Sequence, residues 1–130
     1  MIVVDASIAL EVLLGTETGR RAEARLFERR ETLHAPHLLD LEVAQVLRRY
    51  CVSGDVTPAR AGAALDDLRD LPVTRYPHLV LLARIWELRH NLTAYDAAYV
   101  ALAEALDAPL ASCDASVAAA PGHHVKVELF

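Results

Sequence analysis

The chain of 130 residues is poor in cysteine, lysine and aromatic side chains, and it has no long apolar run. Its two cysteines, Cys51 and Cys113, stand far apart and have no metal-ligand spacing, which favours reduced, buried thiols in a cytosolic protein. No apolar run approaches the ~20 residues that a membrane-spanning helix needs. No basic segment of the kind that begins a secretory signal precedes the first apolar residues. We therefore expect a cytoplasmic protein without a membrane segment.

Basic residues are too few for the positive balance that is typical of nucleic-acid-binding domains. Lysine and arginine together number 13 against 18 aspartates and glutamates, and the formal net charge is -5. This balance does not exclude a nucleic-acid substrate, because bound metal ions would make the surface less negative. With a single lysine in the chain, phosphate contacts would have to come from arginine, and two sets are candidates: Arg21, Arg25 and Arg29, and Arg48 with Arg49. The ordinary alternatives are a solvated helix face for the first set and a complement to the helix dipole for the second.

Short β-type runs alternate with longer helical runs along the chain. We expect strands at residues 2–4, 32–35, 73–76, 109–113 and 125–130, and helices at residues 7–14, 16–30, 36–52, 57–70, 77–90, 93–106 and 115–120. This alternation predicts an α/β protein with a central parallel sheet of about five strands and helices on both faces. The length predicts a single domain, residues 1–130, with a core of ordinary size.

Four acidic residues lie where such a fold would bring them to one point. Asp5 and Asp114 each follow an apolar strand, and in open parallel sheets ligands bind outside the carboxyl ends of the strands. Glu42 lies at the margin of the apolar stripe of its helix, where a carboxylate is partly desolvated and needs a partner. Asp96 stands three residues after Thr93, early in a helix.

Taken singly, most of these acids have an ordinary explanation. Asp5 and Asp114 are able to cap the helices that follow them, and Thr93 with Asp96 forms a capping box. Taken together they favour a cation, because two like charges ~5 Å apart repel by about 3 kcal/mol at an effective dielectric near 20. Oxygen ligands with no histidine or cysteine nearby suit a hard ion, Mg²⁺ or Mn²⁺. The cluster predicts a metal-dependent phosphodiesterase.

Four segments of the chain resemble the PIN-domain ribonucleases, and among these the VapC-type toxins of bacterial toxin–antitoxin pairs. The segments are residues 3–7, 36–44, 92–103 and 110–114. The resemblance extends over the whole chain in length, order and spacing of motifs, and Leu-Thr-Ala-Tyr-Asp-Ala at residues 92–97 is its most specific part. It implies a three-layer PIN-like fold in which the first and fourth strands lie side by side.

The resemblance also implies a set of site residues. Asp5, Glu42, Asp96 and Asp114 correspond to the acidic metal-binding set, of which Asp114 is the weakest correspondence. Three hydroxyl residues would orient carboxylates or waters: Ser7, Ser112 and Thr93. The expected reaction is hydrolysis of an RNA phosphodiester by a water that one or two Mg²⁺ or Mn²⁺ ions activate, with 5′-phosphate and 3′-hydroxyl products. Glu42 would be either a metal ligand or the base that takes the water's proton.

The family further implies a cognate antitoxin protein as partner and a homodimer. The apolar helices at residues 7–14 and 36–52 are candidate contact surfaces. Messenger, transfer and ribosomal RNA all remain open as substrates. The alternative function is a catalytically silent module of the same fold that binds RNA or a protein partner. Phosphotransfer folds fit poorly, since Ala6 and Ser7 follow Asp5 where those folds need a second acid.

Overall fold

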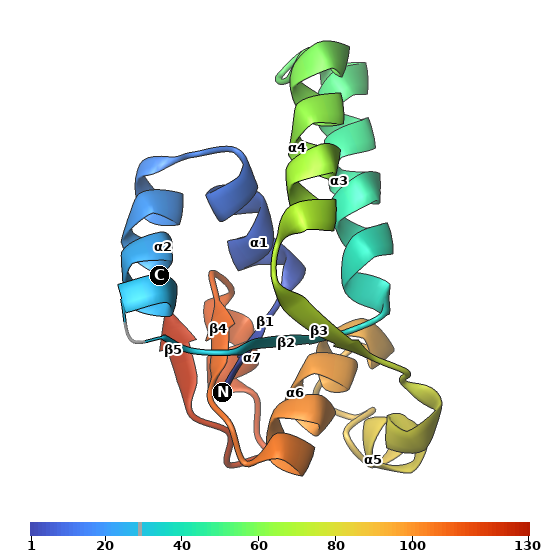
Figure 1. Ribbon diagram of the computed structural model, residues 1–130. Coiled ribbons are helices and arrows are strands. Elements are labelled where there is room, and N and C mark those ends of the chain that lie inside the picture. Colours follow the sequence, from blue (N-terminus) through green and yellow to red (C-terminus); the bar gives the residue numbers. More distant parts are fainter. Residues whose placement is uncertain (29) are drawn as a thin grey trace.

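Five short strands form one parallel sheet in the order β3-β2-β1-β4-β5 (Figure 1). The computed structural model describes residues 1–28 and 30–130. The strands are β1 (Ile2–Val4), β2 (Leu33–Pro36), β3 (Val73–Tyr76), β4 (Leu110–Ser112) and β5 (Val127–Leu129). Because β1 pairs with β2 on one side and with β4 on the other, the expected proximity of the first and fourth strands is confirmed.

The central strands form because they are apolar runs with no polar alternation. Every residue of β1, β2 and β4 is buried, as expected of parallel strands that are covered on both faces. The two edge strands, β3 and β5, carry partly or fully exposed residues instead. The carboxyl ends of β1 and β4 therefore open side by side at the centre of one edge of the sheet.

Helices cover both faces of the sheet. They are α1 (Ala6–Leu13), α2 (Glu17–Glu28), α3 (Leu38–Ser53), α4 (Pro58–Asp70), the 3-10 helix η1 (Leu79–Leu81), α5 (Leu82–Glu87), α6 (Ala94–Leu106) and α7 (Ala115–Ala119). In Figure 1, helices α1 to α4 lie above the sheet and α5 and α6 lie below it. Helices α3 and α4 extend away from the sheet as a pair. In the described part of the chain, no helix has the length and apolar character that crossing a membrane requires.

Threonine caps begin three of the helices. The hydroxyl oxygens of Thr16, Thr57 and Thr93 accept hydrogen bonds from backbone N–H groups three residues further on, at 2.9, 3.1 and 3.2 Å. Helix α2 also packs very closely on α1, because a Cβ at Gly19 would lie 1.9 Å from the carbonyl oxygen of Glu11. Only glycine fits at that contact.

The expectation of one helix over residues 77–90 is wrong. The chain forms the 3-10 turn η1 and then the short helix α5, which ends at Glu87. His78 supplies no side-chain cap, and the N–H of Leu81 bonds to the carbonyl of His78 at 3.0 Å in a tightened first turn. An uncapped helix start satisfies its free groups in this way.

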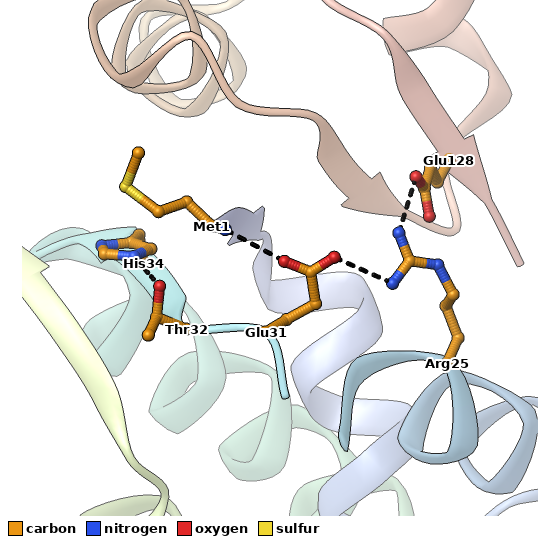
Figure 2. Close-up of polar contacts among 6 residues, drawn as sticks. All are labelled: Met1, Arg25, Glu31, Thr32, His34 and Glu128. Atoms are coloured by element: carbon orange, nitrogen blue, oxygen red, sulfur yellow. Dashed lines mark hydrogen bonds and ion pairs between the residues drawn. The ribbon is translucent and has the colours of Figure 1, made fainter. Parts of the chain in front are cut away.

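Arg25 of α2 joins two glutamates from distant parts of the chain (Figure 2). Its guanidinium lies 3.2 Å from Glu31 and 2.9 Å from Glu128 of β5, while the amino group of Met1 lies 3.0 Å from Glu31. These pairs tie α2 to one edge strand and to the segment that leads into β2. Arg25 was a candidate phosphate contact in the sequence, but its guanidinium forms ion pairs with two glutamates in the structure. Arg29, another candidate of that set, lies outside the described residues.

Candidate active site

Asp5 and Asp114 lie at the carboxyl ends of the neighbouring strands β1 and β4 and also cap the helices that follow. The Asp5 carboxylate accepts a hydrogen bond from the N–H of Ile8 at 3.1 Å, and the Asp114 carboxylate accepts one from the N–H of Ser116 at 2.8 Å. Capping and site formation are therefore not alternatives. The caps orient both side chains while they line one cavity.

Helices α3 and α6 contribute Glu42 and Asp96. Asp96 stands in the first turn of α6, three residues after the Thr93 cap. Tyr99 lies on the same face of α6 three residues later. Its hydroxyl donates a 2.7 Å hydrogen bond to Oε1 of Glu42, although Tyr99 itself is buried. This contact links the two helices across the cavity.

All four acids named from the sequence line one cavity of about 680 Å³. Glu11 of α1 lines it as well, so five carboxylates surround the same space. Asp5 is 9% exposed, Glu42 and Asp96 are partly buried and Asp114 is exposed. The cavity therefore grades from a buried carboxylate at its base to an exposed one at its rim.

None of these five carboxylates forms an ion pair with an arginine, lysine or histidine in the described part of the chain. Elsewhere the fold pairs partly buried acids readily. Arg75 lies 2.8 Å from Asp40, and Arg84 lies 2.7 Å from Glu104. The cavity thus gathers five carboxylates that no arginine, lysine or histidine of the described residues pairs with.

Burial disfavours the ionised forms of three of the acids, and the charge of neighbouring acids adds to this effect for two of them. Burial raises the pKa of Asp5, against hydrogen bonds from Ser112 and Ser7 that lower it. Burial also raises the pKa of Glu42, and the nearby charges of Asp96 and Asp5 add to the rise. For Asp96, burial and the charge of Asp114 raise the pKa. A cation in the cavity would relieve this repulsion.

Two serines fix the strand ends beneath the acids. The Ser7 hydroxyl donates to Oδ1 of Asp5 at 2.5 Å and accepts the N–H of Cys113 at 2.9 Å, which ties the ends of β1 and β4 together. The Ser112 hydroxyl accepts the N–H of Asp114 at 2.9 Å. Both serines therefore contact the segments that carry Asp5 and Asp114.

The donor set suits a hydrated divalent ion rather than a closed metal cage. Within residues 1–28 and 30–130, no three histidine, cysteine, aspartate or glutamate side chains come close enough to hold an ion by themselves. Mg²⁺ commonly takes one or two protein carboxylates, keeps several waters and binds substrate phosphates. Oxygen donors without a cationic partner fit that mode of binding.

Sequence reasoning did not find several residues that line the cavity: Glu11, Gln45, Tyr95 and Tyr99. Helical spacing carries a signal for two of them. Glu11 follows Ser7 by four residues and Tyr99 follows Asp96 by three, so each shares a helix face with a residue already named. Which of the many residues at such spacings reach the cavity depends on how α1, α3 and α6 pack around it.

Comparison with known proteins places the chain in a family. The model of the PIN domain matches residues 2–122. Ribonuclease VapC9 of Mycobacterium tuberculosis is 50% identical over 114 residues, which cover 88% of this chain and 86% of that protein. Ribonuclease VapC1 of the same species is 44% identical over 128 residues, which cover 98% of this chain and 96% of that protein.

Solved structures agree in fold. The crystal structure of PAE2754 from Pyrobaculum aerophilum matches with a TM-score of 0.70 at 26% identity and covers 95% of this chain and 87% of that one. VapBC2 from Rickettsia felis, bound to a DNA fragment from its promoter, matches with a TM-score of 0.69 at 12% identity and covers 98% of both chains. By its sequence and its fold, the chain belongs to the PIN-domain family, among the VapC ribonucleases.

Proposed function

We propose that this protein is an endoribonuclease that hydrolyses RNA phosphodiester bonds with a bound Mg²⁺ or Mn²⁺ ion, and that it acts as the toxin of a toxin–antitoxin pair. The observation that carries the chemistry is the gathering of Asp5, Glu42, Asp96 and Asp114 on one cavity with no cationic partner in the described chain. The relatives named as VapC ribonucleases support RNA as the substrate.

The acidic residues of the cavity would have different roles in the reaction. Asp5 and Asp96 would hold the ion directly, and Asp114 would contribute from the rim through a bound water. When bound, such an ion lowers the pKa of a water and stabilises charge on the phosphate and the leaving oxygen. Glu42 would either bind the ion or take the proton of the attacking water. Both roles need the fixed orientation that the Tyr99 hydrogen bond gives to Glu42.

Orientation of the other acids would come from three hydroxyl groups. Ser7 holds Oδ1 of Asp5, while Ser112 holds the backbone of Asp114. Thr93 caps α6 at the backbone N–H of Asp96. Groups that orient metal ligands commonly contribute 10–100-fold to metal affinity or activity, so each of the three should affect cleavage without touching substrate.

A cognate antitoxin is the partner that we propose. The relatives are VapC proteins, and the structural neighbour VapBC2 is bound to DNA from its promoter. A nuclease that cuts cellular RNA harms the cell that makes it, so a neutralising protein is expected beside it. We also propose a homodimer, from the family resemblance, and a cytoplasmic location, from the reduced thiols that the sequence predicts for Cys51 and Cys113.

Cleavage of total cellular RNA tests the function directly. The purified chain should produce discrete fragments with Mg²⁺ or Mn²⁺ and none with EDTA. Asp96→Asn should lower the rate by about 100-fold or more, because it removes a proposed direct ligand. Asp67→Asn is the matched control: Asp67 is an exposed acid on α4, outside the cavity, and its loss should leave the rate unchanged.

Mass spectrometry of the fragment ends distinguishes hydrolysis by water from other mechanisms of RNA cleavage. Water attack should leave 5′-phosphate and 3′-hydroxyl ends, whereas 2′,3′-cyclic phosphate ends would contradict the proposal. Complete absence of cleavage by folded, metal-loaded chain that is free of antitoxin would instead favour the silent binding module.

A further inference from the structure

The cavity extends along helix α3 well beyond Glu42. Its lining on α3 runs from Leu38 through Glu42 and Gln45 to Arg49 and Tyr50. At ~1.5 Å per helical residue, this wall is about 18 Å long, and Arg49 lies about 10 Å along the helix axis from Glu42. A trough of that length exceeds what a single phosphodiester group needs.

Arg49 stands in this acidic trough without pairing with any acid. It is the only arginine, lysine or histidine among the described residues that line the cavity. Its side chain is exposed, and within the described residues its guanidinium makes no ion pair and no hydrogen bond. Five carboxylates line the same cavity, yet none of them pairs with Arg49, which is therefore available to an anion from outside.

Tyr95 lines the same cavity from the first turn of α6. It directly precedes Asp96, yet it is 65% exposed. Tyr99, one turn further along the helix, is buried and hydrogen-bonded, whereas the Tyr95 hydroxyl has no partner in the described part of the chain. An exposed aromatic ring beside a site that binds a single strand is a natural stacking platform for an unpaired base.

We propose that Arg49 and Tyr95 form an RNA-binding subsite that extends the active site on two sides. Tyr95 stacks on an unpaired base next to the bond that is cut. Arg49 contacts a backbone phosphate about three stacked nucleotides away, at ~3.4 Å of rise per nucleotide. The inference rests on the proposed ribonuclease function, and it selects single-stranded RNA, because paired bases are not free to stack on a side chain.

Two matched pairs of variants test the subsite. Arg48 is exposed and next to Arg49 but does not line the cavity, and Trp86 is a 67% exposed aromatic residue on α5, also outside the cavity. Binding is measured by fluorescence anisotropy in EDTA, where cleavage is blocked. The probes are a labelled single-stranded RNA of about 12 nucleotides and an oligomer of the same length with sugars and phosphates but no bases.

We expect Arg49→Ala to weaken binding of both probes about 5- to 10-fold. The slope of the logarithm of the binding constant against the logarithm of the salt concentration should become shallower by about 0.7, the value for one lost phosphate contact on a single strand. Tyr95→Leu should weaken binding of the RNA about 5- to 150-fold and leave the base-free oligomer unaffected. Arg48→Ala and Trp86→Leu should bind both probes like the wild type. In the presence of Mg²⁺, Arg49→Ala and Tyr95→Leu should also cleave RNA more slowly than the wild type, whereas Arg48→Ala and Trp86→Leu should cleave it at the wild-type rate.

The outcomes separate this inference from the function on which it rests. A wild-type chain that binds or cuts RNA while Arg49→Ala behaves like Arg48→Ala, or Tyr95→Leu like Trp86→Leu, overturns the corresponding half of the subsite alone. An equal loss on both probes for Tyr95→Leu overturns base stacking. A wild-type chain that neither binds nor cuts any RNA overturns the proposed function and the subsite together.

Discussion

Tyr99 offers the acidic cavity a hydrogen-bond donor that carries no charge. Its burial, together with the charge of the adjacent Glu42, strongly raises its pKa, so the hydroxyl keeps its proton at any physiological pH. The hydroxyl therefore holds Glu42 in one orientation without neutralising it. An arginine in the same place would satisfy Glu42 but would also compete with the cation that the cavity is proposed to bind.

Replacing Tyr99 with phenylalanine should show this positioning role. We expect kcat to fall about 10-fold or more, because Glu42 loses its fixed orientation, while KM for RNA changes much less. Stability in EDTA should fall by about 1–2 kcal/mol for the lost hydrogen bond to a charged group. Steady-state cleavage measures kcat and KM, urea unfolding measures stability, and Mn²⁺ titration calorimetry shows whether the metal affinity changes.

Tyr76→Phe is the control for that experiment. The Tyr76 hydroxyl also makes a partly buried hydrogen bond, at 2.8 Å from Nδ1 of His34, but it lies outside the cavity. Its loss should lower stability and leave kcat unchanged. If Tyr99→Phe retains wild-type kcat and Mn²⁺ affinity, the contact is structural only.

At the scale of single residues, the acids were accessible to sequence reasoning, but most of their neighbours were not. Asp5 and Asp114 each follow an apolar strand, and Glu42 sits at the edge of an apolar stripe, so local pattern singles them out. Arg49 was named only together with Arg48, because charge alone does not tell two adjacent arginines apart. The distinction is made by the rotation of α3 against α1 and α6, which is a matter of tertiary packing.

The pair of helices α3 and α4 depends on the turn at Gly54. This residue has a φ of 81° and ends α3, and its N–H bonds to the carbonyls of Tyr50 and Cys51. A side chain at Gly54 would meet no atom within 4 Å, so any cost of substitution comes from the backbone alone. Since α3 carries both Glu42 and Arg49, the turn supports the wall of the site.

Two glycine-to-alanine substitutions in this pair of helices should have opposite effects. Gly54→Ala should lower the free energy of unfolding by about 1–2 kcal/mol, because alanine is strained at positive φ. Gly62→Ala should raise it by about 0.5–1 kcal/mol, since Gly62 lies inside the exposed face of α4 with no atom within 4 Å of the added carbon. Urea unfolding of both variants measures the difference, and a destabilised Gly62→Ala would refute this account.

Element boundaries followed from the sequence wherever a local device marks them. Thr57 with Pro58, the Thr93 cap and the Ser53-Gly54-Asp55 turn each act through neighbouring residues, and the structure has them all. The region of η1 and α5 was mispredicted because Pro77 signals a helix start there but no side chain caps it. Its apolar residues Leu79 and Val80 are 75% and 80% exposed. The spacing of apolar residues in this region therefore does not mark the buried face of a helix.

The stability of the whole molecule should reflect the unpaired charges of the site. Because the folded chain raises the pKa of Glu42 above its ordinary value of 4.5, protonated Glu42 is compatible with the fold and ionised Glu42 opposes it. The stability that is present below about pH 4.5 is therefore lost as the pH rises through the raised pKa. Metal-free protein should carry this penalty at neutral pH.

Glu42→Gln should consequently stabilise the metal-free protein while it abolishes efficient cleavage. Glutamine keeps an acceptor for Tyr99 but has no charge, so we expect a gain of about 1 kcal/mol at neutral pH that disappears toward pH 4. Urea unfolding in EDTA across this range measures it. Glu23→Gln, an exposed position on α2, should give no such gain, and Mn²⁺ should stabilise the wild type more than Glu42→Gln. Equal stability of Glu42→Gln and wild type at every pH would contradict the argument.

The sheet order also determines when during synthesis the protein becomes active. Its first strand lies at the centre of the sheet and pairs with β4, which is made only after residue 110, and the acids of the cavity extend from Asp5 to Asp114. Domains emerge from the ribosome N-terminus first, and long-range parallel pairing forms late. A nascent or prematurely terminated chain therefore lacks part of the proposed active site. Whatever RNA it cuts, the protein assembles its proposed active site only after the residues up to Asp114 have been synthesised and β4 has paired with β1.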